Sequence, residues 1–291
     1  MNQKCSQYLL KKIIIRIDYE QAQEIDVDNA VQKVRKHFFE KRYKLFQNVV
    51  PLTSVQTEGA VPIGELNGIS AVNVINESFR EYQFRKLRET IKFSSRCLII
   101  EDLIENDYKG SKSYIDNIVT LMSALYEENS YIFLKRIGLR KIDSLVFKEI
   151  SNIGKYFDDK VFNQSDSLEK YRDFGDIFVA SNSKISIASK EKICKANIIT
   201  DIQTGDFCEE SGETGQAIQA VLDIDMYKDQ FEKNESDEFV NYIVSIYNVL
   251  NKESYNIYKS ALTERFYSDL LKGTVNDTDI LGGVFNVQNC D

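Results

Sequence analysis

Regular alternation of apolar and polar residues constrains the fold of this chain more than any other feature of its sequence. Residues 8–19 read YLLKKIIIRIDY, and one side of an extended chain receives Ile13, Ile15, Ile17 and Tyr19. The other side receives Ile14, Arg16 and Asp18. A period of two predicts a β-strand with one buried face. Comparable runs predict further strands within residues 79–103, 131–143, 176–202 and 217–227.

Stretches with helical spacing separate these strands. Apolar residues recur at the spacing of amphipathic helices within residues 26–46, 111–128 and 236–269. Residues 47–78 hold both prolines and three glycines, so they are predicted to form a loop with short strands. The resulting order favours an α+β fold, an antiparallel sheet with helices packed on one face. A doubly wound parallel sheet would need strands that alternate regularly with helices.

The chain is long enough for one large domain or two small ones, since it has 291 residues. The predicted elements divide into an N-terminal α+β half, residues 1–150, and a C-terminal α+β half that ends in a helical tail, residues 151–291. These could be two related halves or parts of one continuous domain. No internal repeat in the sequence decides between the two arrangements.

Charge and composition narrow the classes of function. The net charge of −8 disfavours a protein that binds nucleic acid over a wide surface, because such affinity comes from neutralising phosphates. A local basic groove stays compatible with it. No apolar run approaches the roughly 18 residues that a membrane helix needs, so we expect no membrane partner. The five cysteines are scattered without a CxxC pair, which favours reduced thiols in the cytoplasm.

The most informative motif of the chain is RIGLRKID, which begins at Arg136. On a strand, Arg136, Gly138 and Arg140 project to the same side, and the glycine leaves room for a close approach by a backbone or a ligand. Two guanidinium groups in this position are suited to grip a carboxylate or a phosphate. The alternative is a structural cluster of ion pairs, because Asp223 and Asp225 in LDIDMY have the same spacing on another strand.

The same motif resembles the R-x-G-L-R-Y-[IV]-N signature of a prokaryotic protein family that is sporadically distributed and has no established activity. Also similar are LLKKIIIRIDY, YQFRKLRETIKFSSRCLII, LDIDMY and ALTERFYSDL, so the resemblance extends from about residue 8 to about residue 270. Lys141 stands where the family usually has tyrosine, and Asp143 where it usually has asparagine. The resemblance implies a shared α+β architecture. The patchy distribution suggests an accessory system such as a toxin–antitoxin or phage-defence module.

Other chemistry receives less support from the residues. The chain has a single histidine, His37, and neither a GxSxG elbow nor a nucleotide-binding loop accompanies it. Asp223 and Asp225 could hold a metal ion for phosphoryl chemistry if further carboxylates lie nearby in space. A second basic stretch, REYQFRKLR, places on one strand face Arg80, Tyr82, Phe84 and Lys86. RNA-binding sheets use basic and stacking residues in this way, although Tyr82 and Phe84 also suit a core.

The sequence therefore favours a soluble cytoplasmic protein that acts by binding another protein, with Arg136, Gly138 and Arg140 as the candidate contact. We expect no cofactor. An enzyme is disfavoured because no catalytic centre can be assembled from the motifs. The alternative is a nucleic-acid-associated effector in which Asp223 and Asp225 hold a metal ion while Arg136 and Arg140 engage phosphate.

Overall fold

The computed structural model describes residues 9–57, 72–104, 108, 110–162, 180–189, 194–209, 212, 214–231, 238–275, 279–281 and 283–287. Its strands are β1 (Leu10–Glu20), β2 (Lys44–Thr57), β3 (Val72–Lys86), β4 (Glu89–Ser94), β5 (Cys97–Leu103), β6 (Phe133–Phe147), β7 (Ala180–Ala188), β8 (Lys195–Glu209), β9 (Thr214–Lys228) and β10 (Gly283–Val287). Its helices are α2 (Glu24–Glu40), α3 (Ser111–Glu128), α4 (Ile153–Tyr156), α6 (Phe239–Ala261) and α7 (Glu264–Lys272). The predicted α+β class is confirmed.

All the strands of the described residues belong to a single antiparallel sheet of ten strands. The strand order is β10-β8-β9-β6-β1-β5-β4-β3-β2. β7 and β10 follow one another along the same side of β8, because β9 occupies the other side. Residues 137–147 of β6 pair with residues 218–228 of β9. The sheet is therefore continuous across residue 150.

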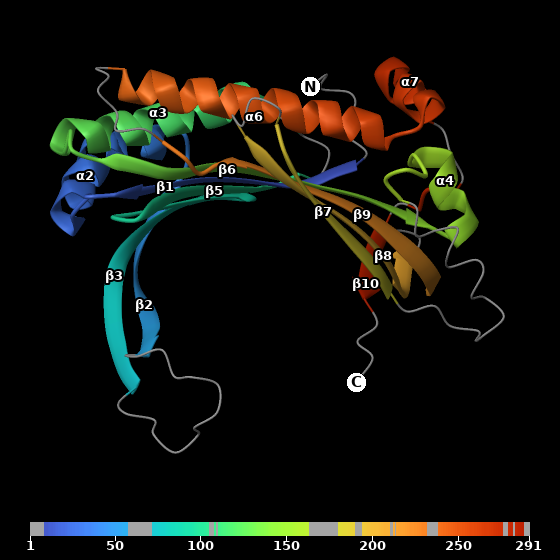
Figure 1. The fold of residues 1–291 in the computed structure, drawn as a ribbon, viewed down its shortest axis with the longest axis horizontal. Coiled ribbons are helices and arrows are strands. Elements are labelled where there is room, and N and C mark those ends of the chain that lie inside the picture. The colour runs from blue at the N-terminus through green and yellow to red at the C-terminus, as the bar shows by residue number, and fades with distance from the viewer. Residues whose placement is uncertain are drawn as a thin grey trace.

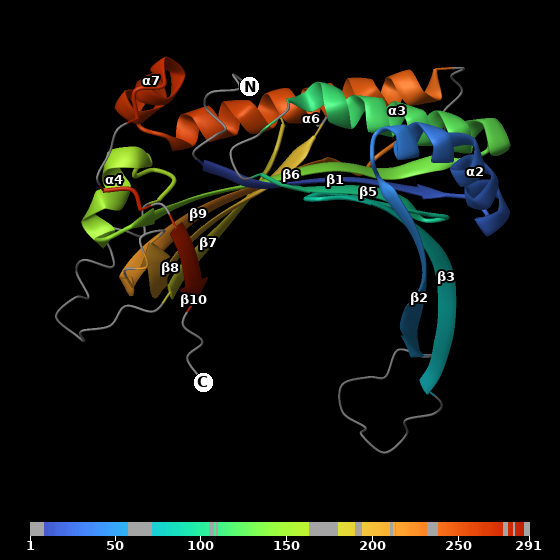
Figure 2. The same ribbon diagram turned by 180° about the vertical axis from the view of Figure 1, so that it is seen from behind.

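Helices cover one face of this sheet (Figure 1). α2, α3 and α6 lie side by side along that face, while α4 and α7 lie near the end of the sheet that carries β9 and β10. The sheet arches, so that the β2–β3 hairpin and the strands β7–β10 bend away from the helix layer (Figure 2). No helix of the described residues lies on the opposite, concave face. Within the same residues, no helix has the length and apolar character needed to cross a lipid bilayer.

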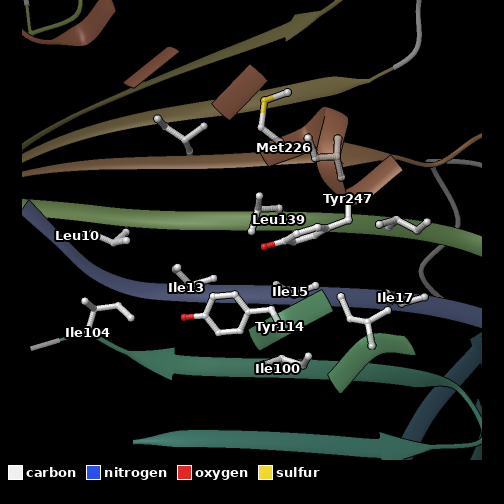
Figure 3. Close-up of a cluster of buried hydrophobic side chains, with 14 of the residues drawn as sticks. Leu10, Ile13, Ile15, Ile17, Ile100, Ile104, Tyr114, Leu139, Met226 and Tyr247 are labelled. Carbon is white, nitrogen blue, oxygen red and sulfur yellow. The ribbon is translucent and has the colours of Figure 1, made fainter. Parts of the chain in front are cut away.

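The hydrophobic core lies between the sheet and the helices (Figure 3). Ile13, Ile15 and Ile17 of β1 are buried and point toward the helix layer, as the alternation predicts. Tyr114 of α3 and Tyr247 of α6 are buried above these strands. Because side chains alternate along a strand, the polar residues between the core positions are directed to the concave face.

The loop predicted over residues 47–78 differs in its described part, residues 47–57 and 72–78, while residues 58–71 lie outside the described residues. Residues 44–57 and 72–86 form the long hairpin strands β2 and β3 in place of a loop with short strands. Pro51 is compatible with β2 because β2 is an edge strand, where a missing N–H leaves no ladder bond unmade. Leu45 fits the spacing of the preceding helix but belongs to β2. The helix ends at Glu40, and Arg42 turns the chain with a φ of 67°.

Candidate functional site on the concave face of the sheet

β6 carries the RIGLRKID motif into the middle of the sheet, between β1 and β9. Ile137 and Leu139 are buried in the core, so the two arginines and the glycine of the motif point to the concave face. Gly138 lies opposite Arg16 of β1 and opposite Tyr227 of β9. The motif is thus flanked on both sides by strands with polar residues on the same face.

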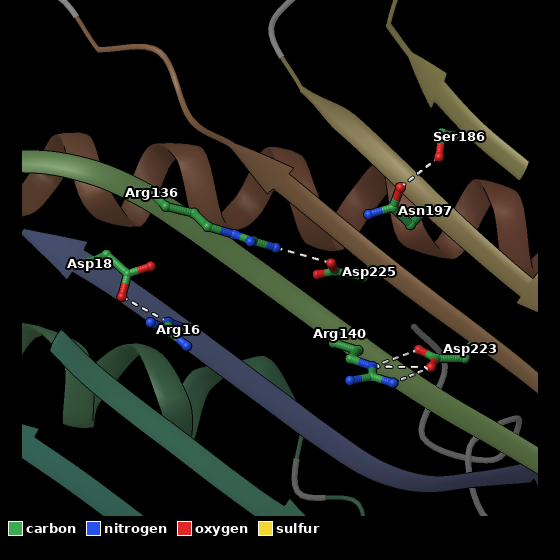
Figure 4. Close-up of polar contacts among 8 residues, drawn as sticks. All are labelled: Arg16, Asp18, Arg136, Arg140, Ser186, Asn197, Asp223 and Asp225. Atoms are coloured by element: carbon green, nitrogen blue, oxygen red, sulfur yellow. Dashed lines mark hydrogen bonds and ion pairs between the residues drawn. The ribbon is translucent and has the colours of Figure 1, made fainter. Parts of the chain in front are cut away.

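Arg136 reaches diagonally across Gly138 to β9 (Figure 4). Its Nη2 donates a hydrogen bond of 3.0 Å to Asp225, and its Cζ lies 4.4 Å from the centroid of the Tyr227 ring. A Cβ atom on Gly138 would lie 3.4 Å from Nε of Arg136. In the structure, the room above Gly138 is therefore taken by the side chain of Arg136, which can then stack on Tyr227.

Arg140 also reaches across to β9, leaning in the same direction as Arg136, and binds Asp223. Its Nε donates to both carboxylate oxygens, at 2.9 and 3.1 Å, and its Nη2 donates to Oδ2. These hydrogen bonds raise the pKa of Arg140 above its ordinary value. Asp225 lies directly opposite Arg140, but because both arginines lean the same way, Asp225 is left for Arg136. The ion pairs that the spacing of the two motifs allowed are present.

Polar contacts continue on both sides of these pairs (Figure 4). On β1, Arg16 donates a hydrogen bond of 2.7 Å to Asp18. Toward the other edge, Ser186 of β7 donates one of 2.8 Å to Asn197 of β8. The motif itself does not predict these residues or Tyr227. The alternation along residues 8–19 assigns Arg16 and Asp18 to one face of their strand. Tyr227 could have been assigned to the face of Asp225 because it follows Asp225 by two positions.

We call six charged residues at the centre of this surface the charged face: Arg16, Asp18, Arg136, Arg140, Asp223 and Asp225. Its three guanidinium groups are balanced by three carboxylates. Arg136 and Arg140 keep 37% and 43% of their side chains exposed, whereas Asp225 and Asp223 keep 25% and 9%. The carboxylates, which are more buried, therefore hold the arginine side chains in place and leave guanidinium N–H groups accessible.

The second basic stretch lies on the helix side of β3. Arg80 donates hydrogen bonds of 2.8 and 2.6 Å to two carboxylates of α2. Tyr82 and Phe84 are buried, and Nζ of Lys86 lies 5.6 Å from the centroid of the Tyr43 ring. α2 covers the face on which these side chains lie, which fits the core role that the sequence left open for them.

Asp223 and Asp225 are the alternative metal ligands. Each accepts a hydrogen bond from an arginine, which competes with a metal ion for the same oxygens. In the part of the chain that the structure describes, no group of three or more histidine, cysteine, aspartate or glutamate residues is placed to hold a metal ion. A metal ion would have to displace the arginines, so the geometry supports the ion pairs more than a metal site.

The chain matches no model of a known protein family, and no curated protein matches it. Any functional conclusion therefore depends on the side chains of the charged face and on the chemistry that they allow. Those side chains supply positioned hydrogen-bond donors and alternating charges, which are the means of recognising another molecule by its polar surface.

Proposed function

We propose that this chain is a soluble cytoplasmic binding protein that recognises another protein through its charged face. The observation that carries the proposal is that Arg136 and Arg140 are both held in place and exposed. Each is fixed by an aspartate and still exposes more than a third of its side chain. An arginine held in this way presents its free N–H groups in a set direction, and it loses little side-chain entropy when a partner binds. Arg136 lies across Gly138, within van der Waals distance of where a Cβ atom would be.

The balance of charges favours a protein partner over nucleic acid. On the charged face a phosphate backbone would meet carboxylates as often as guanidinium groups, and the net charge of −8 adds to the repulsion. A protein surface carries charges of both signs and can match such a pattern. The nucleic-acid-associated effector would need Asp223 and Asp225 to exchange arginine for a metal ion. No contact among the described residues favours that exchange.

The biological setting is proposed from the resemblance of the RIGLRKID motif. The family that it resembles is sporadically distributed among prokaryotes, which is typical of accessory systems. We therefore place the binding role in a bacterial accessory module, with phage defence as the leading case. The partner would then be another component of the same module.

We also propose that the chain is built from two related halves, whose boundary lies before β6 and not at residue 150. On this division each half begins with one of the two central strands, β1 or β6, which are antiparallel neighbours. Each central strand pairs on its other side with the last strand of the meander that follows it, β5 or β9. A long helix follows each of these meanders, α3 or α6. The matching order of elements supports a common origin for the halves.

The binding proposal is tested by exchanging the charges of one pair. Arg140→Ala leaves the carboxylate of Asp223 without its partner, so we expect a loss of about 1–3 kcal/mol in the free energy of unfolding. The combined variant Arg140→Asp, Asp223→Arg restores an ion pair but moves the guanidinium group from β6 to β9. We expect it to regain the melting temperature of the wild type and to lose the protein partner that the wild-type chain retains when isolated from its host.

A matched control exchanges a pair on the helix side of the molecule. Lys33 and Glu128 form an ion pair of 2.6 Å between α2 and α3, and Lys33→Glu, Glu128→Lys should keep the partner. If the Arg140 and Asp223 exchange restores both the melting temperature and the partner, the pair is structural only and the proposal is wrong. Stoichiometric nucleic acid in place of a protein would favour the effector instead.

A further inference from the structure

The turn between β3 and β4 carries an exposed leucine in an unfavourable backbone conformation. Lys86 pairs with Glu89, so Leu87 and Arg88 alone form the turn. Leu87 has a φ of 28°, and 98% of the residue is exposed. Hairpin turns of this length need positive φ, which glycine, asparagine or aspartate adopt at lower cost. Neither the backbone nor the solvent favours a leucine here, which points to a role outside folding.

Basic residues from several segments lie at the same end of the sheet as Leu87. Lys44 of β2 lies opposite Arg85, and Arg42 precedes Lys44 by two positions at the same end of the sheet. On the other side of the turn, the N–H of Leu103 donates to the carbonyl of Arg88, and Lys12 lies opposite Leu103. We call this surface the Leu87 tip: Lys12, Arg42, Lys44, Arg85, Lys86, Leu87, Arg88 and Leu103.

Two acidic residues next to the Leu87 tip, Glu89 and Glu101, have partners outside it. Glu89 accepts a hydrogen bond of 2.8 Å from Asn117 of α3, which lies on the helix side. Glu101 of β5 is paired with Lys92 at 3.4 Å. In a chain with a net charge of −8, this end of the sheet thus holds six basic residues near one protruding leucine.

We propose that the Leu87 tip docks an acidic surface of a protein, with Leu87 inserted in an apolar pocket of that partner. The basic residues at this end select an acidic partner and speed its approach, and burial of Leu87 supplies the apolar contact. Nucleic acid fits less well, because bases need open aromatic faces. Of the two rings at this end, Tyr43 is buried, and Arg85 lies over Phe46 at 5.1 Å from its centroid, although 43% of Phe46 is exposed. The inference rests on the proposed function only in that the partner is a protein, since it uses no residue of the charged face.

The backbone conformation gives this proposal a discriminating test. Leu87→Asn relieves the strained turn, so the melting temperature should stay the same or rise. The same change removes the inserted side chain, so docking should weaken at least tenfold. A leucine retained for folding would behave in the opposite way, with a lower melting temperature and unchanged docking.

The partner is located by cross-linking from the tip in the full-length chain. Leu87→p-benzoylphenylalanine, expressed in the native host and irradiated, should form a specific protein adduct. Mass spectrometry should place the cross-link in an acidic segment with apolar residues. Arg85→Glu together with Arg88→Glu, or 0.5 M salt, should reduce the adduct severalfold. The matched control is Tyr131→p-benzoylphenylalanine, because Tyr131 is also exposed but lies beyond the other end of β1.

Several results would overturn the proposal. They are the absence of an adduct, equal adducts from positions 87 and 131, a cross-link to nucleic acid or lipid, and a cross-linked segment without acidic residues. The two proposals can fail separately. If the Arg140 and Asp223 exchange leaves the partner bound while Leu87→Asn releases it, the charged face fails and the tip stands. The reverse pattern leaves the charged face and removes the tip.

Discussion

Asp143 and Lys141 place two ionisable groups on the buried side of β6. Asp143 is 1% exposed, and its Oδ1 has no hydrogen-bond partner among the described residues. Burial raises the pKa of Asp143 from 3.8 to about 7, although the positive charges of Lys141 and Lys11 oppose that rise. Burial lowers the pKa of Lys141 to about 8, and its Nζ donates a hydrogen bond of 2.7 Å to Asn251 of α6. Both residues belong to the RIGLRKID motif.

The raised pKa of Asp143 makes stability depend on pH. Between about pH 4 and pH 7 the folded state retains a proton that the unfolded state has lost, so stability falls as pH rises through this window. Asp143→Asn removes this titration. We predict that the free energy of unfolding of the variant, relative to that of the wild type, rises by about 2–4 kcal/mol from pH 4.5 to pH 7.5. Urea unfolding of both proteins at the two pH values measures this change. If the stability difference between variant and wild type is the same at both pH values, the pKa of Asp143 is not raised in the folded state.

At the scale of elements, the two outer edges of the sheet differ in how they are protected. An edge strand presents N–H and C=O groups with which another chain can pair. β2 forms one edge and contains Pro51, which has no N–H to offer, whereas the sequence of β7 contains no proline. The proline thus explains how the long hairpin strand β2 stays open to solvent without inviting a further strand.

We predict that Pro51→Thr increases self-association through this edge. The change adds an N–H group and a residue with high strand propensity. The mean mass measured by sedimentation or light scattering should then rise with protein concentration more steeply than for the wild type. Val49→Thr is the matched control, since it changes an exposed residue of the same strand and leaves the backbone donors unaltered. Equal association of both variants would show that Pro51 does not protect the edge.

For the whole molecule, the sheet joins the two halves through its centre. β6 belongs to residues 1–150, yet β9 from residues 151–291 forms one side of its pairing. Arg136 and Arg140 take their carboxylates from β9 as well, and Tyr247 of α6 is buried in the core cluster that includes Ile15 of β1. Separation after residue 150 would expose the central strand and part of the core.

We therefore predict that the fragments 1–150 and 151–291 do not fold alone and that the full chain unfolds in one cooperative transition. Circular dichroism during heating measures this for each fragment and for the full chain. Co-expression of the fragments should restore a cooperative transition if the break itself is tolerated. A fragment that melts cooperatively by itself would establish an independent domain and contradict the prediction.

The sequence by itself determined which residues share a side of each strand. Ile13, Ile15 and Ile17 were predicted to face the core, and Arg136 and Arg140 to share a side. Such assignments succeed because the period of two is a local property of an extended chain. The α+β class follows from the order of these local patterns in the same way. Residues 47–57 and 72–78 were mispredicted because proline and glycine report local preference, and an edge strand tolerates proline.

Only the tertiary structure decided which strands lie next to each other. Arg136 meets Asp225, 89 residues away, because β6 lies between β1 and β9. The Leu87 tip likewise gains Lys12 through the pairing of β1 with β5. Strand order and register depend on pairing between distant segments and on the shared core, which no local pattern encodes. The sequence could therefore identify the arginines and the aspartates separately, whereas the fold brought them together as one surface.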